Sequence, residues 1–502
     1  TLVNENTLSY STTINQDHDI SAVAGYAYNL TKIGTSTMSS NGGYNSSTIT
    51  SLNAAVSVTG NTNETQNVLL SYFGRVQYGY KGKYLLSASV RRDGSSVFGA
   101  NKRWGYFPSV GLAWRVDNEP FMENQKIFDE LKLRVSYGVT GNSLGFSPYT
   151  TKLIYGNVGT FYYNGSQQSA IGALQNENPD LGWEKTATAN IGVDFAGAKG
   201  KVSGSLEVYD KTTSDLIWTY PVSTVLYPNG SLTANVGKMS NKGAELTVNV
   251  AAVRTKHFSW NTTLNLAHNR NKIESLSNST LKTDSVKIVQ PDGGGQTGET
   301  VQVIVAGMPI GQFYTYEYAG KDANGISQYY KANGELTTRP ESGKDYRMLG
   351  NAQPKLLLGW TNSFTYKNFD LNVFFRSVLG NKIMNVTRAD LYRPSTARFT
   401  NIPVEVAGES AADYNSYRYS SRFIEDGSYL RLDNATLAYT FKNVGKNFKR
   451  VRVYTSVNNL FVITNYKGID PEINQGGIAP GVDSNNFYPK TRTFLFGVNA
   501  SF

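Results

Sequence analysis

Hydrophobic and polar residues alternate along much of this chain with a period of two, which predicts β-strands that have two unlike faces. In the segment 492–502 (RTFLFGVNASF), Phe494 and Phe496 fall on one face and Asn499 falls on the other. The pattern predicts fifteen strands in all. Their approximate ranges are 4–14, 18–28, 66–79, 83–92, 106–117, 130–140, 184–196, 201–213, 242–253, 257–269, 355–367, 369–377, 428–441, 450–460 and 492–502.

The two faces of these strands differ in a way that bears on the fold class. The apolar face is nearly free of charge, whereas the other face carries charged residues, namely Arg75, Arg134, Glu207, Glu245 and Arg376. A soluble sandwich hides its apolar face against a second sheet and has no room for such charges between its sheets. A membrane barrel instead turns its apolar face to lipid and keeps its interior polar. We therefore expect an all-β fold, a transmembrane antiparallel β-barrel; the ordinary sandwich is the alternative.

The connections between the expected strands alternate between short turns and long loops. Short turns on one rim and long loops on the other are typical of outer-membrane barrels, whose long loops face outside the cell. A short helix is expected within 118–129. The predicted long extracellular loops are 29–65, 141–183, 214–241, 270–354, 378–427 and 461–491.

Composition narrows the alternatives further. The chain has 502 residues with 33 Tyr, 23 Phe and no Cys, which excludes a disulfide scaffold and a cysteine metal site. No linker divides the chain, so we expect 1–502 to be part of one domain. The sequence contains no run of about 18 apolar residues, so it predicts no transmembrane helix. The net charge of +10 is scattered rather than clustered, which argues against nucleic acid as a partner. No signal peptide is expected in this chain, because it begins inside patterned sequence. Because bacterial barrels use even strand numbers, fifteen strands suggest a start in mid-barrel.

Several segments, in this order, resemble one family, the SusC-like (SusC/RagA) TonB-dependent outer-membrane transporters of Bacteroidetes. The segments are 89–98 (SVRRDGSSVF), 103–114 (RWGYFPSVGLAW), 131–142 (LKLRVSYGVTGN), 178–185 (NPDLGWEK), 235–245 (NVGKMSNKGAE), 421–441 (SRFIEDGSYLRLDNATLAYTF) and 456–472 (SVNNLFVITNYKGIDPE).

The resemblance implies a 22-stranded barrel, of which this chain would supply the C-terminal fifteen or so strands. It also implies an N-terminal plug and a TonB box, which would draw energy through TonB-ExbB-ExbD. The plug, the TonB box and the first third of the barrel are not found in this chain, so the remaining N-terminal part of the barrel is expected elsewhere. The other implied partners are outer-membrane lipid and a SusD-like surface lipoprotein that lids the barrel. A dimer of such pairs is left open.

Two short motifs supply candidate contact residues for ligand or partner. Arg91, Arg92 and Asp93 lie at the end of an expected strand, where paired arginines could meet an anionic or hydroxylated ligand. The alternative is that Arg92 pairs with Asp93 in a turn built on Gly94. Trp183, which follows the turn at 178–180, is either a platform for a sugar ring or an anchor at the membrane interface.

Aromatic residues in two long loops supply the remaining candidates. They could stack on sugar rings, contact a partner protein, or pack the loops against themselves. These residues are Tyr314, Tyr316, Tyr329 and Tyr330 in 270–354, and Tyr414, Tyr417 and Tyr419 with Arg393 in 378–427. Asp322, Asn324 and Gly325 imitate the start of a calcium loop but lack the acidic residue that would complete it. We therefore expect no metal and no cofactor.

Catalytic motifs are nearly absent. The three histidines lack metal-ligand spacing, and no HExxH motif, P-loop or nucleophile elbow occurs. An outer-membrane hydrolase would need a carboxylate or Ser/His cluster that this sequence does not offer. We therefore expect not an enzyme but a TonB-dependent importer of oligosaccharide or peptide in the bacterial outer membrane. The alternative is a structural or adhesive surface barrel that binds other proteins through its loops.

Overall fold

The structure is a computed structural model that describes most of the chain. The described residues are 1–44, 48, 51–143, 145–278, 281–291, 296–445, 447–473, 476–483 and 488–502.

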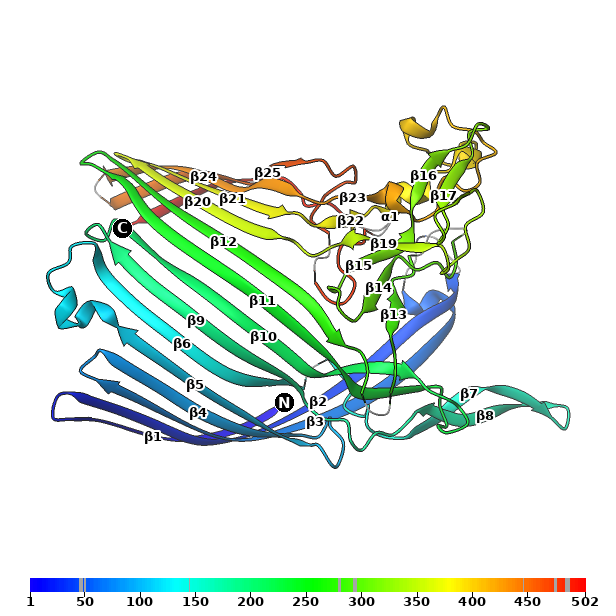
Figure 1. Cartoon of the computed structure of the whole chain (residues 1–502), viewed down its shortest axis with the longest axis horizontal. Helices are drawn as coiled ribbons and strands as arrows, with labels where there is room; N and C mark the ends of the chain where they lie inside the picture. The colour runs from blue at the N-terminus through cyan, green and yellow to red at the C-terminus, as the bar shows by residue number, and fades with distance from the viewer. Residues whose placement is uncertain are drawn as a thin grey trace. The chain divides into compact units, whose positions relative to one another are not determined.

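Fifteen antiparallel strands form one large sheet, in the number and chain order that the alternation predicts (Figure 1). Neighbours in the sheet are also neighbours along the chain once the loop strands are left out. In sheet order, the strands are β1 (Leu2–Ile14), β2 (His18–Tyr44), β3 (Ala55–Tyr80), β4 (Tyr84–Ser95), β5 (Trp104–Arg115), β6 (Phe128–Asn142), β9 (Glu184–Gly197), β10 (Val202–Pro221), β11 (Ser231–Arg254), β12 (Phe258–Ser275), β20 (Leu356–Tyr366), β21 (Phe369–Leu379), β24 (Tyr429–Val444), β25 (Phe448–Thr464) and β26 (Thr493–Ser501).

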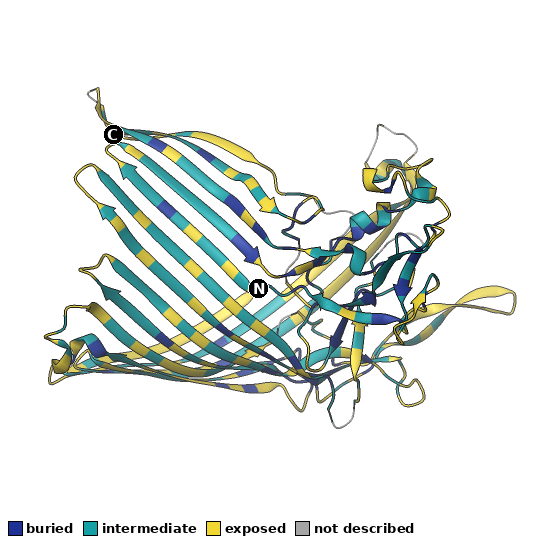
Figure 2. Ribbon diagram, turned by 45° about the horizontal axis from the view of Figure 1, so that its top comes forward, coloured by how far each residue is buried: buried dark blue, intermediate teal, exposed yellow. Residues whose placement is uncertain are grey.

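The two faces of the strands differ in exposure as well as in polarity. Along many strands, exposed residues alternate with less exposed ones (Figure 2). Large apolar side chains such as Leu437 and Phe496 are exposed, at 47% and 78%, whereas Arg431 on the opposite face is fully buried. The apolar face thus remains uncovered, while the polar face holds the buried charge. This arrangement is typical of the wall of a membrane barrel and not of a soluble sandwich.

Several strands are longer than their alternation indicates. The segment 29–65, expected to be a loop, instead continues β2 to Tyr44 and starts β3 at Ala55. These extensions pair as a ribbon, with Ile33 opposite Thr65 and Ser39 opposite Thr59. Ser, Thr, Asn and Gly dominate here, so no apolar alternation marks the strand, yet backbone hydrogen bonds need none. Likewise, β10 and β11 extend into the expected loop 214–241, which shortens it to 222–230.

The remaining long loops contain small elements of their own. The predicted loop 141–183 contains a two-stranded hairpin of β7 (Ile154–Tyr163) and β8 (Ser166–Gln175). The segment 270–354 forms a four-stranded sheet of β13 (Ser285–Ile288), β14 (Gln302–Val305), β15 (Gln312–Tyr316) and β19 (Tyr346–Asn351), and a three-stranded sheet of β16 (Tyr318–Lys321), β17 (Ser327–Tyr330) and β18 (Leu336–Thr337). The segment 378–427 holds β22 (Lys382–Met384), β23 (Ile424–Asp426) and the helix α1 (Val386–Leu391).

Short 3-10 turns complete the secondary structure, and one of them, at Pro120–Met122, is the short helix expected within 118–129. The others are Leu52–Ala54, Val116–Asn118, Pro394–Thr396, Val404–Val406 and Ser421–Phe423. Among the described residues, no helix is both long and apolar enough to cross a membrane.

The chain divides into two compact units, each with its own packed clusters. Unit 1 comprises Thr1–Leu112, Ser136–Ala187 and Thr213–Gly237, and unit 2 comprises the remaining residues. The core of unit 1 is an aromatic cluster around Phe98, Phe107 and Trp183. The largest core of unit 2 lies among its loops and includes Phe313, Tyr392, Tyr419 and Phe423.

Candidate functional site

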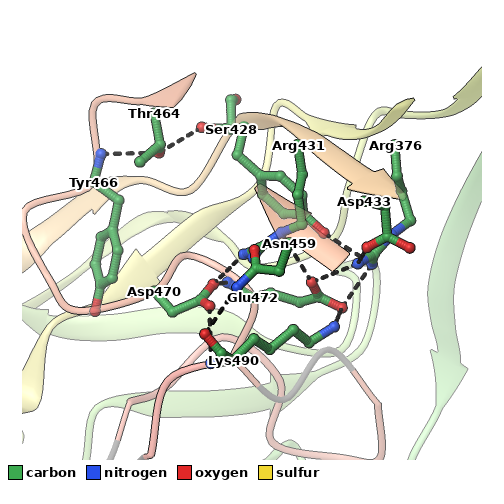
Figure 3. A network of polar contacts seen from close by, with 11 residues as sticks. Arg376, Ser428, Arg431, Asp433, Asn459, Thr464, Tyr466, Asp470, Glu472 and Lys490 are labelled. Carbon is green, nitrogen blue, oxygen red and sulfur yellow. Dashed lines mark hydrogen bonds and ion pairs between the residues drawn. The ribbon is translucent and has the colours of Figure 1, made fainter. Parts of the chain in front are cut away.

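A network of ion pairs in unit 2 ties the loop 465–492 to the polar face of the sheet (Figure 3). At its centre is Arg431 of β24, whose side chain is only 1% exposed. Its guanidinium donates to Asp470 at 2.5 Å and also to Asn459. A charge buried to this degree requires a charged partner with good geometry, because desolvation otherwise disfavours the ion. The pair therefore fixes where the loop lies.

A second arginine completes the network from the neighbouring strand. Arg376 of β21 donates to both oxygens of Glu472, at 2.6 and 2.7 Å, and to Asp433 at 2.9 Å. Lys490, near the other end of the loop, reaches Glu472 at 2.5 Å. The three cations (Arg376, Arg431 and Lys490) are matched by three anions (Asp433, Asp470 and Glu472), so the network is neutral in sum.

The ionisation of Glu472 depends on its burial and on its cationic partners in the network. Burial alone would raise the pKa of its carboxyl, but hydrogen bonds from Arg376 and Lys490 outweigh that effect and hold the pKa below its usual range. Glu472 therefore remains an anion at neutral pH, and both ends of the loop are held by the same carboxylate.

The network borders a cavity of about 660 Å³ on the polar side of unit 2. This volume is typical of small-molecule pockets, which span about 300–1,000 Å³. Strand residues form most of its wall, and Glu472 with Ile473 contributes the loop side. The lining residues are Tyr209, Glu245, Ala267, Asn269, Gln353, Pro354, Leu357, Arg376, Val378, Tyr429, Glu472 and Ile473.

A second ionic cluster lies further along the polar face of unit 2. Arg134 of β6 donates to Asp194 of β9 at 2.8 Å and to Glu207 of β10 at 2.6 Å, and Lys132 pairs with Asp194 at 3.2 Å. One arginine thus links three strands. The predicted inward direction of Arg134 and Glu207 agrees with this pairing.

In unit 1, amide side chains bridge several of the described loop segments. Asn176 is 5% exposed and donates to the carbonyls of Asn229 and Ser231, at 2.6 and 2.7 Å. Gln175 donates to the carbonyls of Tyr149 and Lys152. Each amide satisfies backbone groups that a loop would otherwise leave to water, so these loops are ordered without charge.

The candidate residues Arg91, Arg92 and Asp93 lie in β4, which continues to Ser95 and makes no turn at Gly94. Arg91, not Arg92, pairs with Asp93, at 2.8 Å. The predicted Arg92–Asp93 pair was wrong because alternate residues of a strand share a face. Arg92 lies instead over the ring of Trp104, 4.4 Å from its centroid.

Trp183 is buried, at 6% exposure, and presents its ring to other aromatic residues. It packs against Phe98 and Phe107, and its Nε1 donates to the carbonyl of Arg103 at 2.9 Å. A Cβ on Gly141 would lie 2.2 Å from Phe107, so glycine is needed there for the rings to approach. In this structure Trp183 is a core residue of unit 1.

The four tyrosines predicted in 270–354 lie in the small loop sheets and pack largely on one another. Tyr316 and Tyr329 are fully buried and form a cluster with Tyr346, while Tyr314 packs against it. Burial, aided by the nearby Glu299, raises the pKa of Tyr316 to about 12. Tyr330 lies beneath Arg347. The tyrosines thus stabilise their loop, which is one of the three interpretations that the sequence left open.

The candidates in 378–427 differ widely in exposure. Tyr419 is buried at 1%, and Arg393 lies over the ring of Tyr417, 4.1 Å from its centroid. Tyr414 is 70% exposed and is the member of this set that faces solvent most fully. Whether any of the predicted residues contacts a ligand or partner stays a prediction.

The segment that imitates a calcium loop is a hairpin turn between β16 and β17. The Asp322 carboxylate accepts hydrogen bonds from the backbone N–H groups of Asn324 and Ile326, at 2.9 and 2.8 Å. In the described part of the chain, no group of three or more His, Cys, Asp or Glu residues could hold a metal ion.

The sequence did not single out the members of the central network as site residues. Arg431, Asp470 and Glu472 are ordinary charges when read along the chain, and their pairing appears only when the loop folds back on the strands. The available signal was the pair of acids in Asp470-Pro471-Glu472 after a strand, together with one arginine in each of two neighbouring strands.

Comparison with known proteins gives a consistent result. The family described as "TonB dependent receptor-like, beta-barrel" matches residues 2–460. The TonB-dependent receptor SusC of Bacteroides thetaiotaomicron is 33% identical over 87% of this chain and 44% of its own length. The TonB-dependent receptor P26 of Formosa agariphila is 32% identical over 99% of this chain and 53% of its own length.

A solved structure shows the same fold. The RagAB peptide transporter aligns with a TM-score of 0.83 and 25% identity, over 100% of this chain and 55% of that one. The chain therefore spans about half the length of the proteins that it matches. These matches confirm the predicted barrel fold and the family resemblance.

Proposed function

We propose that this chain takes part in energy-coupled nutrient import, because it belongs to the TonB-dependent receptor-like β-barrel family. The family consists of outer-membrane barrels that act as receptors and transporters, not enzymes, as the sequence predicted. The chain would supply part of the barrel wall, with its apolar face against lipid and its polar face along the path of the nutrient.

One observation carries this proposal. The fifteen strands present exposed apolar side chains on one face, whereas the opposite face holds paired charges such as Arg376 with Glu472 and Arg134 with Asp194. A wall with this polarity separates hydrocarbon from a wet interior, and it bounds a cavity of about 660 Å³ that could receive a solute.

The partners follow from the family and are proposed for this chain. A plug and a TonB box would couple import to TonB-ExbB-ExbD, and a SusD-like lipoprotein would lid the barrel on its outer side. We propose that the fifteen strands belong to a single barrel domain whose long loops face outside the cell. Exposed loop residues such as Tyr414 are then available for a lid or for cargo.

Growth on a single carbon or nitrogen source tests the proposed import. Deletion of the gene should abolish growth on one class of oligosaccharide or peptide and leave growth on its monomers intact. Normal growth on every nutrient, combined with loss of attachment to surfaces or to other cells, would instead support the adhesive barrel.

A further inference from the structure

Three segments in the loops and ribbons of unit 1 carry no charge in their sequence. The segments 33–63, 153–176 and 216–237 contain no Asp, Glu, Lys, Arg or His. The loops of unit 2, by contrast, are rich in ion pairs, such as Arg388 with Glu405 and Arg422 with Glu409. A surface free of ionised groups gains nothing from a charged partner, which would lose hydration without electrostatic compensation.

An open cavity of about 420 Å³ lies between one of these segments, 216–237, and the neighbouring residues 145–150. Its wall combines two aromatic rings, Phe146 and Trp218, with four hydroxyl groups, and it holds no ionisable side chain. The lining residues are Gly145, Phe146, Ser147, Thr150, Ile217, Trp218, Thr219 and Thr233.

The amide bridges of unit 1 hold the walls of this cavity in place. Asn178 donates to the carbonyl of Thr233 at 2.8 Å, and Gln175 secures the segment 149–152 through two carbonyls. The hydroxyls of Thr219 and Thr233 lie 2.9 Å apart, and the hydroxyl of Thr150 donates to the carbonyl of Ser147 at 2.8 Å. A site ordered before its ligand arrives loses less entropy on binding.

We propose that this cavity binds one or two hexose units of a neutral oligosaccharide. A pyranose ring has an apolar C–H face that fits against an aromatic side chain, and its edge carries hydroxyls that can exchange hydrogen bonds with threonine and serine. The lining offers both kinds of group. This inference rests on the proposed import function, because it makes the cavity a contact point for the nutrient.

The same lining disfavours the other substrate classes. A short peptide has a charged amino group and a charged carboxylate, and an acidic sugar has a carboxylate, yet no lining residue carries a charge to match either. Binding of a neutral sugar should moreover be insensitive to ionic strength, since salt screens only charges.

The test uses the protein as its cell makes it, purified from outer membranes in detergent, and isothermal titration calorimetry. The neutral probes are the tetrasaccharides of glucose (α-1,4 and β-1,4), of mannose and of xylose. The charged probes are tri-galacturonate, the glucosamine trimer and tetra-alanine. At least one neutral probe should bind with the same Kd at low and high salt, and the charged probes should bind more weakly.

Two variants locate the site. Trp218→Ala should weaken binding of the neutral probe by about tenfold or more, as expected for loss of one aromatic stacking contact. Tyr163→Ala is the matched control, because it removes an exposed ring (71%) at the tip of the β7–β8 hairpin, outside the cavity lining. Tyr163→Ala should leave Kd unchanged.

The outcomes separate the inference from the proposed function. Preference for a charged probe, binding of no neutral probe, or a neutral-probe Kd unaffected by Trp218→Ala would each overturn the inference. Nutrient-dependent growth that still requires the protein would in those cases leave the import function standing. Growth that never requires the protein would refute the import function itself.

Discussion

At the scale of single residues, the most consequential side chain is Arg431. Its charge is buried, and it is stabilised by Asp470, Glu472 and Asn459 rather than by water. A buried ion pair adds little net stability, but removing Arg431 would leave the buried Asp470 without a charged partner. The stability of the loop 465–492 should therefore depend on it strongly.

Replacing Arg431 by Met should lower the free energy of unfolding by about 3–5 kcal/mol, because Asp470 would remain buried and unpaired. Urea-induced unfolding in detergent measures the change. The control is Arg347→Met, which breaks a half-exposed pair with Glu317 and should cost less than about 1 kcal/mol. Equal losses in both variants would contradict the assigned role of Arg431.

Acid should release the loop through Glu472. Its pKa in the folded protein is held below the usual range, so its contribution is fully present above the pKa of the unfolded state, about 4.3, and is lost as pH falls through the folded value. Limited acid-protease cleavage within 465–492 should therefore begin only below about pH 4. In Glu472→Gln, cleavage should depend on pH less steeply across this window than in the parent.

At the scale of elements, the two units order their long connections in different ways. Unit 2 uses small sheets, buried tyrosines and ion pairs, whereas unit 1 uses amide bridges and extended ribbons. The β7–β8 hairpin is the clearest ribbon, with exposed Tyr155, Tyr162 and Ile171 and a tight turn at Asn164-Gly165. Both turn residues have positive φ, 49° and 76°, a combination that favours glycine and asparagine.

Substituting Gly165 by Val should destabilise this hairpin by about 1–2 kcal/mol, since a β-branched residue is strained at positive φ. Faster amide hydrogen exchange across 154–175, with an unchanged transition for the large sheet, would show the local effect. Gly34→Val in the β2–β3 ribbon is the control, because no atom lies within 4 Å of the added Cβ. That variant should exchange as the parent does.

How far the sequence predicts each element depends on what orders it. Alternating residues such as Leu371 and Arg376 marked the strands of the wall, because one face must be apolar. The ribbon extensions around Thr37 and Asn61 were missed, since the pairing is made by the backbone alone. The burial of the Trp183 ring and the partners of Arg431 were not predicted either. Both depend on segments that come together only after folding.

At the scale of the whole molecule, the decisive property is the contrast between the two faces of the large sheet. Leu437 and Thr436 are adjacent in β24, yet Leu437 is exposed on the apolar face and Thr436 hydrogen-bonds to Ser456 on the polar face. The same substitution should therefore have opposite consequences at these two positions.

Leu437→Arg should cost about 2–4 kcal/mol if the residue lies near the middle of the bilayer, and should reduce the amount of folded protein in the outer membrane. Thr436→Arg should be tolerated better, because its side chain would face the wet interior. Membrane fractionation with heat-dependent gel mobility measures both. Comparable folded yields of the two variants would contradict the assignment of the apolar face to lipid.

The network around Glu472 also has a consequence for how the protein matures. Arg376 precedes Glu472 by 96 residues, and the two arginines come from β21 and β24, which must align before the carboxylate can reach either. Contacts of such long range form late in folding. The segment 465–492 should thus be among the last to become ordered, and a newly inserted chain would pass through a stage in which cellular quality-control proteases can still recognise it.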